Sequence, residues 1–241
     1  MKGHVAVCIV NYNLPDLTDA LVERLDRILC VPHRPYVLDN GSDRAAPARR
    51  TTHRVSPNRR TTGGWNEVLL QAAADGAYSA YWLLCNDVTF PNDDCPLTPL
   101  IAAAYSDDFG IVHPAYAGRS RSSWREMFHR PGAGMVATWA VEFNAPLIRA
   151  DVLPHVWPFD AALFYGYGVD NETGYRARRA GFRVGICHAA LCEHVPFTTC
   201  RGGADPLSRD EYIARASRNM QQVLARKYGP EWKRLFTEGA P

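Results

Sequence analysis

Polar residues that could bind a ligand end three successive apolar segments in the N-terminal part of the chain. An asparagine pair, an aspartate pair and an Asn-Asp pair stand there: Asn11, Asn13, Asp39, Asp43, Asn86 and Asp87. Each residue alone is an ordinary turn or cap residue. Because ligands of open α/β sheets bind at the carboxyl ends of the strands, the three pairs together predict a ligand site. Carboxylates at such an edge accept hydrogen bonds or bind hard divalent cations.

The elements that would carry these residues alternate between strand and helix. Three short apolar runs are typical of buried strands, at residues 4–10, 35–38 and 81–84, and a further short strand is expected at 54–55. Apolar residues recur at helical spacing over 15–29 and again after the glycines at 63 and 64. This alternation predicts a parallel α/β sheet over about the first hundred residues.

The second half of the chain is less regular. Residues 119–134 are polar and typical of a mobile loop, whereas residues 135–148 are apolar and rich in β-formers. Helices are expected over 172–180 and 210–228, with a strand at 183–186 between them. No linker divides the chain, so we expect one domain over residues 1–241.

Composition excludes several classes of protein. The chain has 241 residues, 46% hydrophobic and 22% charged, with a net charge of +2, which indicates a globular protein without a nucleic-acid-binding field. No apolar run approaches the roughly 18 residues of a membrane-spanning helix, and the start of the chain is typical of a strand rather than a signal peptide. Seven scattered cysteines without a C-x-x-C pair indicate neither structural zinc nor a disulfide framework, so we expect a cytoplasmic protein.

Three common enzyme motifs are absent from the sequence. No G-x-G-x-x-G follows the first predicted strand, and no G-x-x-x-x-G-K-[ST] occurs, which argues against dinucleotide oxidoreductases and P-loop enzymes. The nucleophile motif G-x-S-x-G is also missing, which argues against a hydrolase of that architecture.

Five segments resemble motifs of the family 2 glycosyltransferases of the GT-A fold, in that family's order. They are VAVCIVNYN at 5–13, VLDNGSD at 37–43, TGGWN at 62–66, YWLLCNDV at 81–88 and GVDNETGYR at 168–176. The N-D-V of the fourth segment resembles the rhamnosyltransferase-like branch, and His194 stands where the family has a late histidine. The resemblance covers roughly residues 4–228.

The resemblance implies an α/β fold of GT-A type, with a mixed central sheet flanked by helices. It implies a nucleotide-binding half at about 1–100, an acceptor-binding half at about 101–205 and a C-terminal helix at about 206–241. The implied activity is inverting transfer of a sugar from a nucleotide diphosphate donor to an acceptor hydroxyl. The acceptor, whether glycan, lipid or protein, and the oligomeric state stay open.

The resemblance also implies roles for individual residues. Asp170 would be the catalytic base, while Asp87 and His194 would hold Mn²⁺ or Mg²⁺. Glu172 would lie at the acceptor site. Independently of the resemblance, Trp124 in the polar segment 119–134 is expected at the acceptor site, because sugars stack on aromatic faces. The donor nucleotide would contact seven residues, namely Asn11, Asn13, Asp39, Asp43, Gly64, Asn66 and Asn86.

The sequence departs from the family pattern at three positions. Cys85 replaces the first acid of D-x-D, Val169 replaces the first acid of E-D, and Glu172 stands where the family has Asp. These losses favour one rival, a non-catalytic protein that binds carbohydrates or nucleotide sugars. A second rival, a sugar nucleotidyltransferase, needs a Gly-rich basic signature after the first strand, which residues 11–16 lack.

Overall fold

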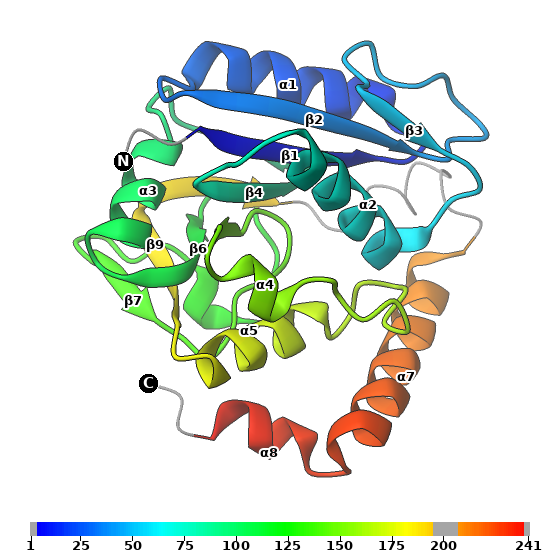
Figure 1. Cartoon of the computed structure of the whole chain (residues 1–241), viewed down its shortest axis with the longest axis vertical. Helices are drawn as coiled ribbons and strands as arrows, with labels where there is room; N and C mark the ends of the chain where they lie inside the picture. Colours follow the sequence, from blue (N-terminus) through cyan, green and yellow to red (C-terminus); the bar gives the residue numbers. More distant parts are fainter. Residues whose placement is uncertain (1–3, 195–206, 239–241) are drawn as a thin grey trace.

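The computed structural model describes residues 4–194 and 207–238 and contains one central sheet (Figure 1). Within these residues its strands run in the order β3-β2-β1-β4-β8-β6-β9-β5, and β7 pairs with β9 outside this path. The strands are β1 (Val5–Asn11), β2 (His33–Asn40), β3 (His53–Val55), β4 (Ala80–Cys85), β5 (Val88–Thr89), β6 (Phe109–Tyr116), β7 (Met135–Ala137), β8 (Leu147–Arg149) and β9 (Arg183–His194).

The first four strands form the parallel half of the sheet. Asn11 at the end of β1 pairs with Asp39 of β2, and Val10 pairs with Cys85 of β4. Helices cover both faces, which explains why β1 and β4 are nearly continuous apolar runs. The predicted strands and their common carboxyl edge are therefore confirmed.

The other half of the sheet is mixed. Strand β8 is antiparallel to both β4 and β6, whereas β6 and β9 are parallel. The two-residue strand β5 pairs antiparallel with the end of β9, so that Val88 lies opposite His194. This pairing brings the end of β9 back to the edge where β1, β2 and β4 end.

Helices flank the sheet on both faces. They are α1 (Pro15–Ile28), α2 (Arg60–Asp75), α3 (Leu97–Tyr105), α4 (Leu153–Val156), α5 (Val169–Arg179), α7 (Arg209–Tyr228) and α8 (Trp232–Thr237), with one 3₁₀ turn at Arg125–Met127. Strand β2 lies on one side of β1 in the sheet, and β4, which follows β3 in the chain, lies on the other side of β1. Right-handed crossovers then place α1 and α2 on opposite faces, as Figure 1 shows.

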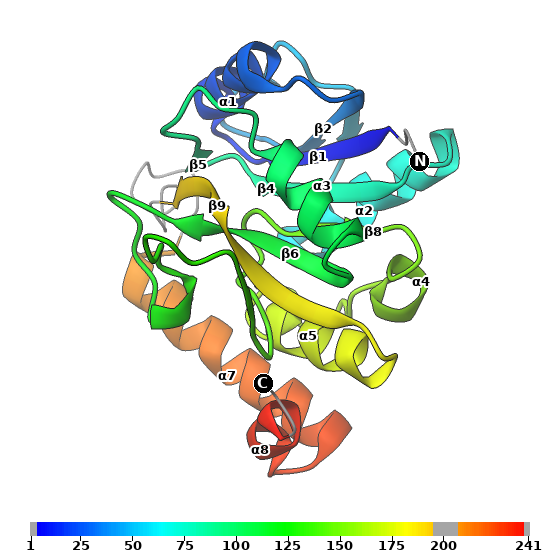
Figure 2. The ribbon, with the colours of Figure 1, turned by 90° about the vertical axis from the view of Figure 1, so that its left-hand side faces the viewer.

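The last two helices form an arm beneath α5 (Figures 1 and 2). Helix α7 begins with a capping box between Ser208 and Glu211, which satisfies free N–H groups of its first turn. Gly168 precedes α5 with φ +87°, and a Cβ there would lie 2.8 Å from Cγ of Met220 on α7. The glycine is thus required both by its backbone conformation and by the close approach of the arm.

Three segments differ from the sequence-based expectations. Residues 135–148 form only β7 and the start of β8. Between these two strands, the carbonyls of Asn144 and Pro146 accept hydrogen bonds from β4, but Pro146 has no N–H to donate in return, so the strand does not extend further. Helix α5 begins at Val169, three residues earlier than predicted. Helix α3 was not predicted, since prolines at 96 and 99 obscure its short apolar pattern but are tolerated in a first turn.

No helix within residues 4–194 or 207–238 is both long and apolar enough to cross a lipid bilayer.

Candidate active site

A large cleft opens where the parallel strands end. Its volume is about 1110 Å³, slightly above the usual range of about 300–1,000 Å³ for small-molecule sites. Its lining includes Tyr12 after β1, Asn86 after β4, Asp170 of α5, Tyr212 of α7 and Phe236 of α8. The cleft therefore extends from the strand ends to the C-terminal arm.

Asp87 and His194 meet in this cleft because β5 pairs with β9. His194 Nε2 lies 3.5 Å from Asp87 Oδ1, and both side chains are largely buried. The side-chain nitrogen of Asn144, Nδ2, lies 2.8 Å from the other ring nitrogen of His194, Nδ1. Because an amide NH₂ group can only donate, Nδ1 accepts this hydrogen bond and the ring proton lies on Nε2, toward Asp87. Nε2 could bind a cation only after this proton moves to Nδ1 and the Asn144 amide turns its oxygen toward the ring.

The chemistry of this pair fits a divalent cation held in part by a substrate. One carboxylate oxygen and one imidazole nitrogen converge, and both ligand types suit Mn²⁺. In the described part of the chain, no third His, Cys, Asp or Glu joins them. Burial raises the pKa of the nearby Cys85 thiol well above its ordinary value, and this thiol donates a hydrogen bond of 3.8 Å to the Phe143 carbonyl. A cation here would take its remaining ligands from water or from a bound diphosphate.

A hydrogen-bonded network connects His194 with Glu142. The Tyr116 hydroxyl lies 2.6 Å from Glu142 Oε2 and 2.7 Å from Asn144 Oδ1, and the Ser122 hydroxyl donates to the other Glu142 oxygen. Burial, and next the charge of Glu142, raise the pKa of Tyr116 well above its ordinary value, so the phenol stays protonated. The network fixes a second carboxylate on the cleft wall.

Asp170 lies in the first turn of α5 on the wall of the same cleft. Its Oδ1 accepts a hydrogen bond of 2.8 Å from the backbone N–H of Asn171. Burial raises the pKa of Asp170 to about 7, and the nearby charge of Glu142 adds to the effect. A carboxylate that titrates near neutral pH is suited to accept a proton from a substrate.

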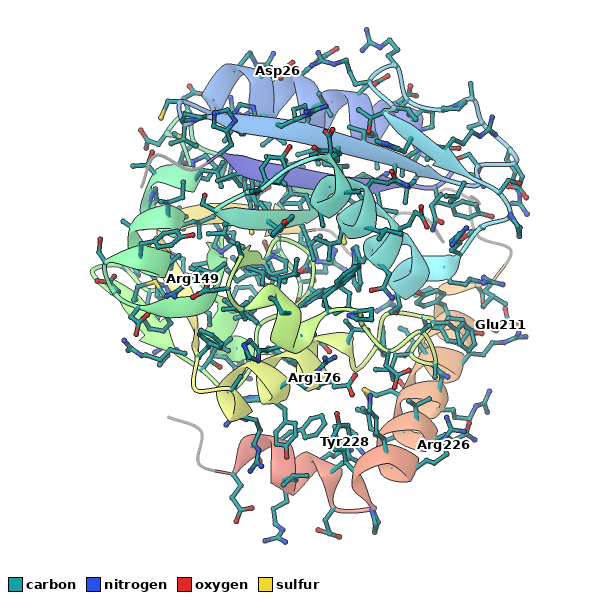
Figure 3. The ribbon with its side chains drawn as sticks, viewed as in Figure 1. Asp26, Arg149, Arg176, Glu211, Arg226 and Tyr228 are labelled. Carbon is teal, nitrogen blue, oxygen red and sulfur yellow. The ribbon has the colours of Figure 1, made fainter. Side chains whose placement is uncertain are left out.

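Glu172 is two residues from Asp170 but faces away from the cleft. Its side chain is 3% exposed, and its Oε1 lies 2.6 Å from Lys227 Nζ and accepts a 2.6 Å hydrogen bond from the Tyr228 hydroxyl. Lys227 also pairs with Asp160 at 2.9 Å. Figure 3 labels Tyr228 between α5 and the arm. The structure therefore places Glu172 as the anchor of α7 and not among the cleft-lining residues.

Asp39 and Asn11 lie just below the cleft and are fully buried. Asn11 Nδ2 donates to Asp39 Oδ1 at 3.1 Å, and the Ser42 hydroxyl donates to the same oxygen. Arg54 Nε lies 3.0 Å from Asp39 Oδ2, but its N–H is not aligned for a hydrogen bond. Asp39 Oδ2 is thus a buried oxygen with a charge partner and no hydrogen-bond donor, which is uncommon in folded proteins.

Asn86 lines the cleft and connects it to this buried group. Its Nδ2 lies 3.0 Å from Thr18 Oγ1 on α1 and 3.3 Å from Asn11 Oδ1. The side chain of Asn86 is thereby fixed beside Asp87 at the end of β4.

Asn13, which follows β1, and Asp43, which follows β2, form a hydrogen-bonded pair. Asn13 Nδ2 donates to Asp43 Oδ1 at 2.8 Å, and Asp43 N donates back to Asn13 Oδ1 at 3.0 Å. The hydrogen bond from Asn13 lowers the pKa of the exposed Asp43 carboxyl. Neither residue lines the cleft, although Tyr12 beside them does.

Gly64 and Asn66 of the TGGWN segment contact other parts of the fold. A Cβ on Gly64 would lie 2.8 Å from Asn40 Nδ2, so only glycine lets α2 approach the end of β2 this closely. Asn66 exchanges two hydrogen bonds with the backbone of Phe159, at 2.9 and 2.8 Å. Neither residue lines the cleft.

Aromatic side chains form the wall farther from the strand ends. Trp124 and Trp139 both line the cleft, and their ring centroids lie 5.0 Å apart. Phe164 and Tyr165 line it as well, with centroids 4.3 Å apart. Flat apolar faces of this kind suit the less polar faces of a substrate.

Sequence reasoning missed Glu142, Asn144 and Tyr116. The first two are the polar members of the otherwise apolar stretch at 135–148, a departure that could have drawn attention to them. Their role depends on contacts with β6 and β9, which sequence spacing does not reveal.

The fold resembles that of known glycosyltransferases. A crystal structure titled GalNAc-T7 with UDP, GalNAc and Mn²⁺ superposes on 97% of this chain with a TM-score of 0.63 at 12% identity. The mannosyltransferase PcManGT from Pyrobaculum calidifontis, in complex with GDP-Man and Mn²⁺, superposes on 98% with a TM-score of 0.59 at 14% identity. The chain spans about half of the first structure, 54%, and 74% of the second.

No protein-family model matches the sequence, and no curated protein sequence matches it. At identities this low, the two structures establish the architecture of the chain and leave its activity to be argued from its own residues. With its mixed central sheet flanked by helices, the chain has the GT-A fold.

Proposed function

We propose that the protein is a glycosyltransferase that moves a sugar from a nucleotide diphosphate donor to an acceptor hydroxyl. The observation that carries this proposal is the presence, in one cleft, of the Asp87–His194 pair and of Asp170 with a pKa of about 7. The two superposed structures contain a nucleotide or nucleotide sugar with Mn²⁺ in a similar fold, which supports the same chemistry. The motif order further favours family 2 and its rhamnosyltransferase-like branch.

The donor would bind at the strand ends. Asp87 and His194 would hold a divalent cation, Mn²⁺ or Mg²⁺, against the diphosphate. When bound, the cation neutralises charge that develops on the leaving diphosphate. Tyr12 lines the cleft beside the β1 end and would contact the base or ribose. Asp39 Oδ2, a buried oxygen without a hydrogen-bond donor, would accept one from the nucleoside once Arg54 moves aside.

Asp170 would act as the base toward the acceptor. A carboxylate with a pKa near 7 is ionised in about half of the molecules at neutral pH and has more proton affinity than an ordinary aspartate. Its oxygen would take the proton of the acceptor hydroxyl while that hydroxyl attacks the anomeric carbon. A single displacement of this kind inverts the configuration at that carbon.

The acceptor would lie along the aromatic wall. The cleft volume of about 1110 Å³ leaves room for a second ligand beside the donor. Trp124 and Trp139 offer flat faces in the same cleft that Asp170 lines. The hydroxyl to be glycosylated would then point at Asp170.

A binding screen tests the donor assignment. The melting temperature of the protein is measured with UDP-, GDP-, CDP- and dTDP-sugars, each with and without Mn²⁺. Ligands that bind the native state raise it by mass action. We expect one nucleotide class to raise the melting temperature in a Mn²⁺-dependent manner. The absence of a shift with every donor at millimolar concentration would contradict the proposed site.

Product analysis separates the rivals. A transferase releases nucleoside diphosphate from the bound donor, whereas a non-catalytic binding protein shows the shift without release. A sugar nucleotidyltransferase instead forms pyrophosphate from a nucleoside triphosphate and a sugar 1-phosphate. The configuration of the transferred sugar, measured by NMR, distinguishes inversion from retention.

A further inference from the structure

Two cysteines far apart in sequence meet on the side of the molecule that carries α1 and α3. Cys30 follows the C-terminus of α1, and Cys95 precedes the N-terminus of α3. The backbone N–H of Cys30 donates to Cys95 Sγ at 3.3 Å, and Cys30 Sγ lies 3.6 Å from Oγ1 of Thr98, three residues after Cys95. Cys30 is exposed and Cys95 is partly exposed. The two sulfur atoms are therefore neighbours that solvent can reach.

The surroundings of Cys95 stabilise a thiolate. Thr98 is the second residue of α3, and its Oγ1 lies 3.6 Å from Cys30 Sγ. Burial disfavours the charged form of Cys95, but the Cys30 N–H, Thr98 and the Cys30 thiol together lower the pKa of Cys95 below its ordinary value. The start of a helix adds partial positive charge in the same place. Cys95 is thus the more nucleophilic sulfur of the two.

Space for a reagent exists beside this sulfur. Cys95 lines a separate cavity of about 160 Å³, together with Pro96, Pro99 and Leu191. By contrast, Cys8 and Cys192 are fully buried, and burial raises the pKa of both thiols. Among the cysteines of residues 4–194, reactivity toward small disulfides should therefore concentrate at Cys95.

We propose that Cys30 and Cys95 form a reversible disulfide, with Cys95 as the attacking sulfur and a small-molecule disulfide such as glutathione disulfide as the oxidant. The Cys95 thiolate attacks one sulfur of glutathione disulfide, whose S–S bond breaks and releases one glutathione thiolate. Cys30 then loses its proton to solvent and attacks the Cys95 sulfur, which expels the second glutathione thiolate. The cysteine pair loses two electrons, and the oxidant is reduced to two glutathiones.

The bond would connect the end of α1 to the start of α3. These residues lie about 65 positions apart in the chain, so the bond closes a long loop in the unfolded state. Closing such a loop stabilises a protein, and we expect the melting temperature to rise by roughly 5–15 °C on oxidation.

Peptide mapping of the full-length protein tests the proposal. The protein is equilibrated in glutathione buffers of increasing oxidation, quenched with acid and alkylated. It is then digested with trypsin and Asp-N, because trypsin alone leaves Cys85 and Cys95 on one peptide, and the peptides are identified by mass spectrometry. We expect a linked pair of peptides containing Cys30 and Cys95, which dithiothreitol separates again. No linked pair, or oxidation that goes first to other cysteines, would overturn the proposal.

Two single variants test the order of attack. In Cys30→Ser, glutathione should stay attached to Cys95 because the second thiol is missing. In Cys95→Ser, Cys30 should react at least several-fold more slowly at pH 7, and oxidation should no longer raise the melting temperature. Equal reaction rates of the two variants would contradict the role of Cys95 as the attacking sulfur.

Discussion

Replacing Asp170 by Asn should abolish turnover and at the same time stabilise the protein above neutral pH. The amide keeps the size of the side chain and an oxygen that accepts the Asn171 N–H, but it loses proton affinity and cannot carry charge. General-base catalysis typically contributes 10²–10⁴-fold, so turnover should fall by about that factor. Donor affinity should hold, because Asp170 is proposed to face the acceptor.

The expected gain in stability follows from the pKa. The pKa of Asp170 is raised from 3.8 to about 7 in the folded protein, so between these values the native state binds more protons than the unfolded state. Stability of the wild type therefore falls as pH rises through this window. A full shift of this size corresponds to about 4 kcal/mol, which we reduce to about 1–3 kcal/mol because the side chain is partly exposed.

Urea unfolding at several pH values measures this effect. Asp170→Asn should equal the wild type near pH 4, gain stability between about pH 4 and 7, and keep a constant gain of about 1–3 kcal/mol above pH 7. Wild-type turnover should rise over the upper part of the same window and level off above pH 7. A variant no more stable than the wild type at pH 8, with unchanged turnover, would refute both the burial of this charge and its role as base.

Three further predictions address the surrounding residues. Asp87→Ala should remove Mn²⁺-dependent donor binding and most turnover, and full wild-type activity in EDTA would show that no metal is needed. Glu172→Gln should retain turnover but lower the unfolding free energy by about 1–3 kcal/mol in urea titrations, since Lys227 loses a buried partner; loss of turnover in a stably folded variant would identify Glu172 as the base. Asp39→Ala should weaken nucleoside diphosphate binding by about 1–3 kcal/mol in calorimetry, and unchanged affinity would assign Asp39 a structural role.

The parallel half of the sheet was predictable because its signals are local. Strands β1 and β4 are buried on both faces, so each is a nearly continuous apolar run, and β2 contains a shorter buried apolar run at 36–38. Because ligands bind at the carboxyl ends of parallel strands, Asn86 and Asp87 could be predicted at the ligand site without knowledge of any contact. The family pattern pointed to Asp170 and His194, which the fold brings to the same cleft.

The remaining features depend on which way a side chain points. Asn66 faces Phe159 and Glu172 faces Lys227, although each stands at a position of the family motif. The motif does not fix this orientation, because it follows from how α2 and α5 pack against later segments. Glu142 and Asn144 were missed for a related reason, since their partners Tyr116 and His194 lie on strands distant in sequence.

Release of nucleoside diphosphate from a bound donor is the most direct test of the proposed function. With the donor selected by the binding screen, Mn²⁺ and water or a saccharide as acceptor, the wild type should release nucleoside diphosphate continuously. Asp170→Asn should bind the same donor with unchanged affinity and release it roughly 10²–10⁴-fold more slowly. A wild-type protein that binds the donor and never cleaves it, or equal release by both proteins, would contradict catalysis by Asp170 in this cleft.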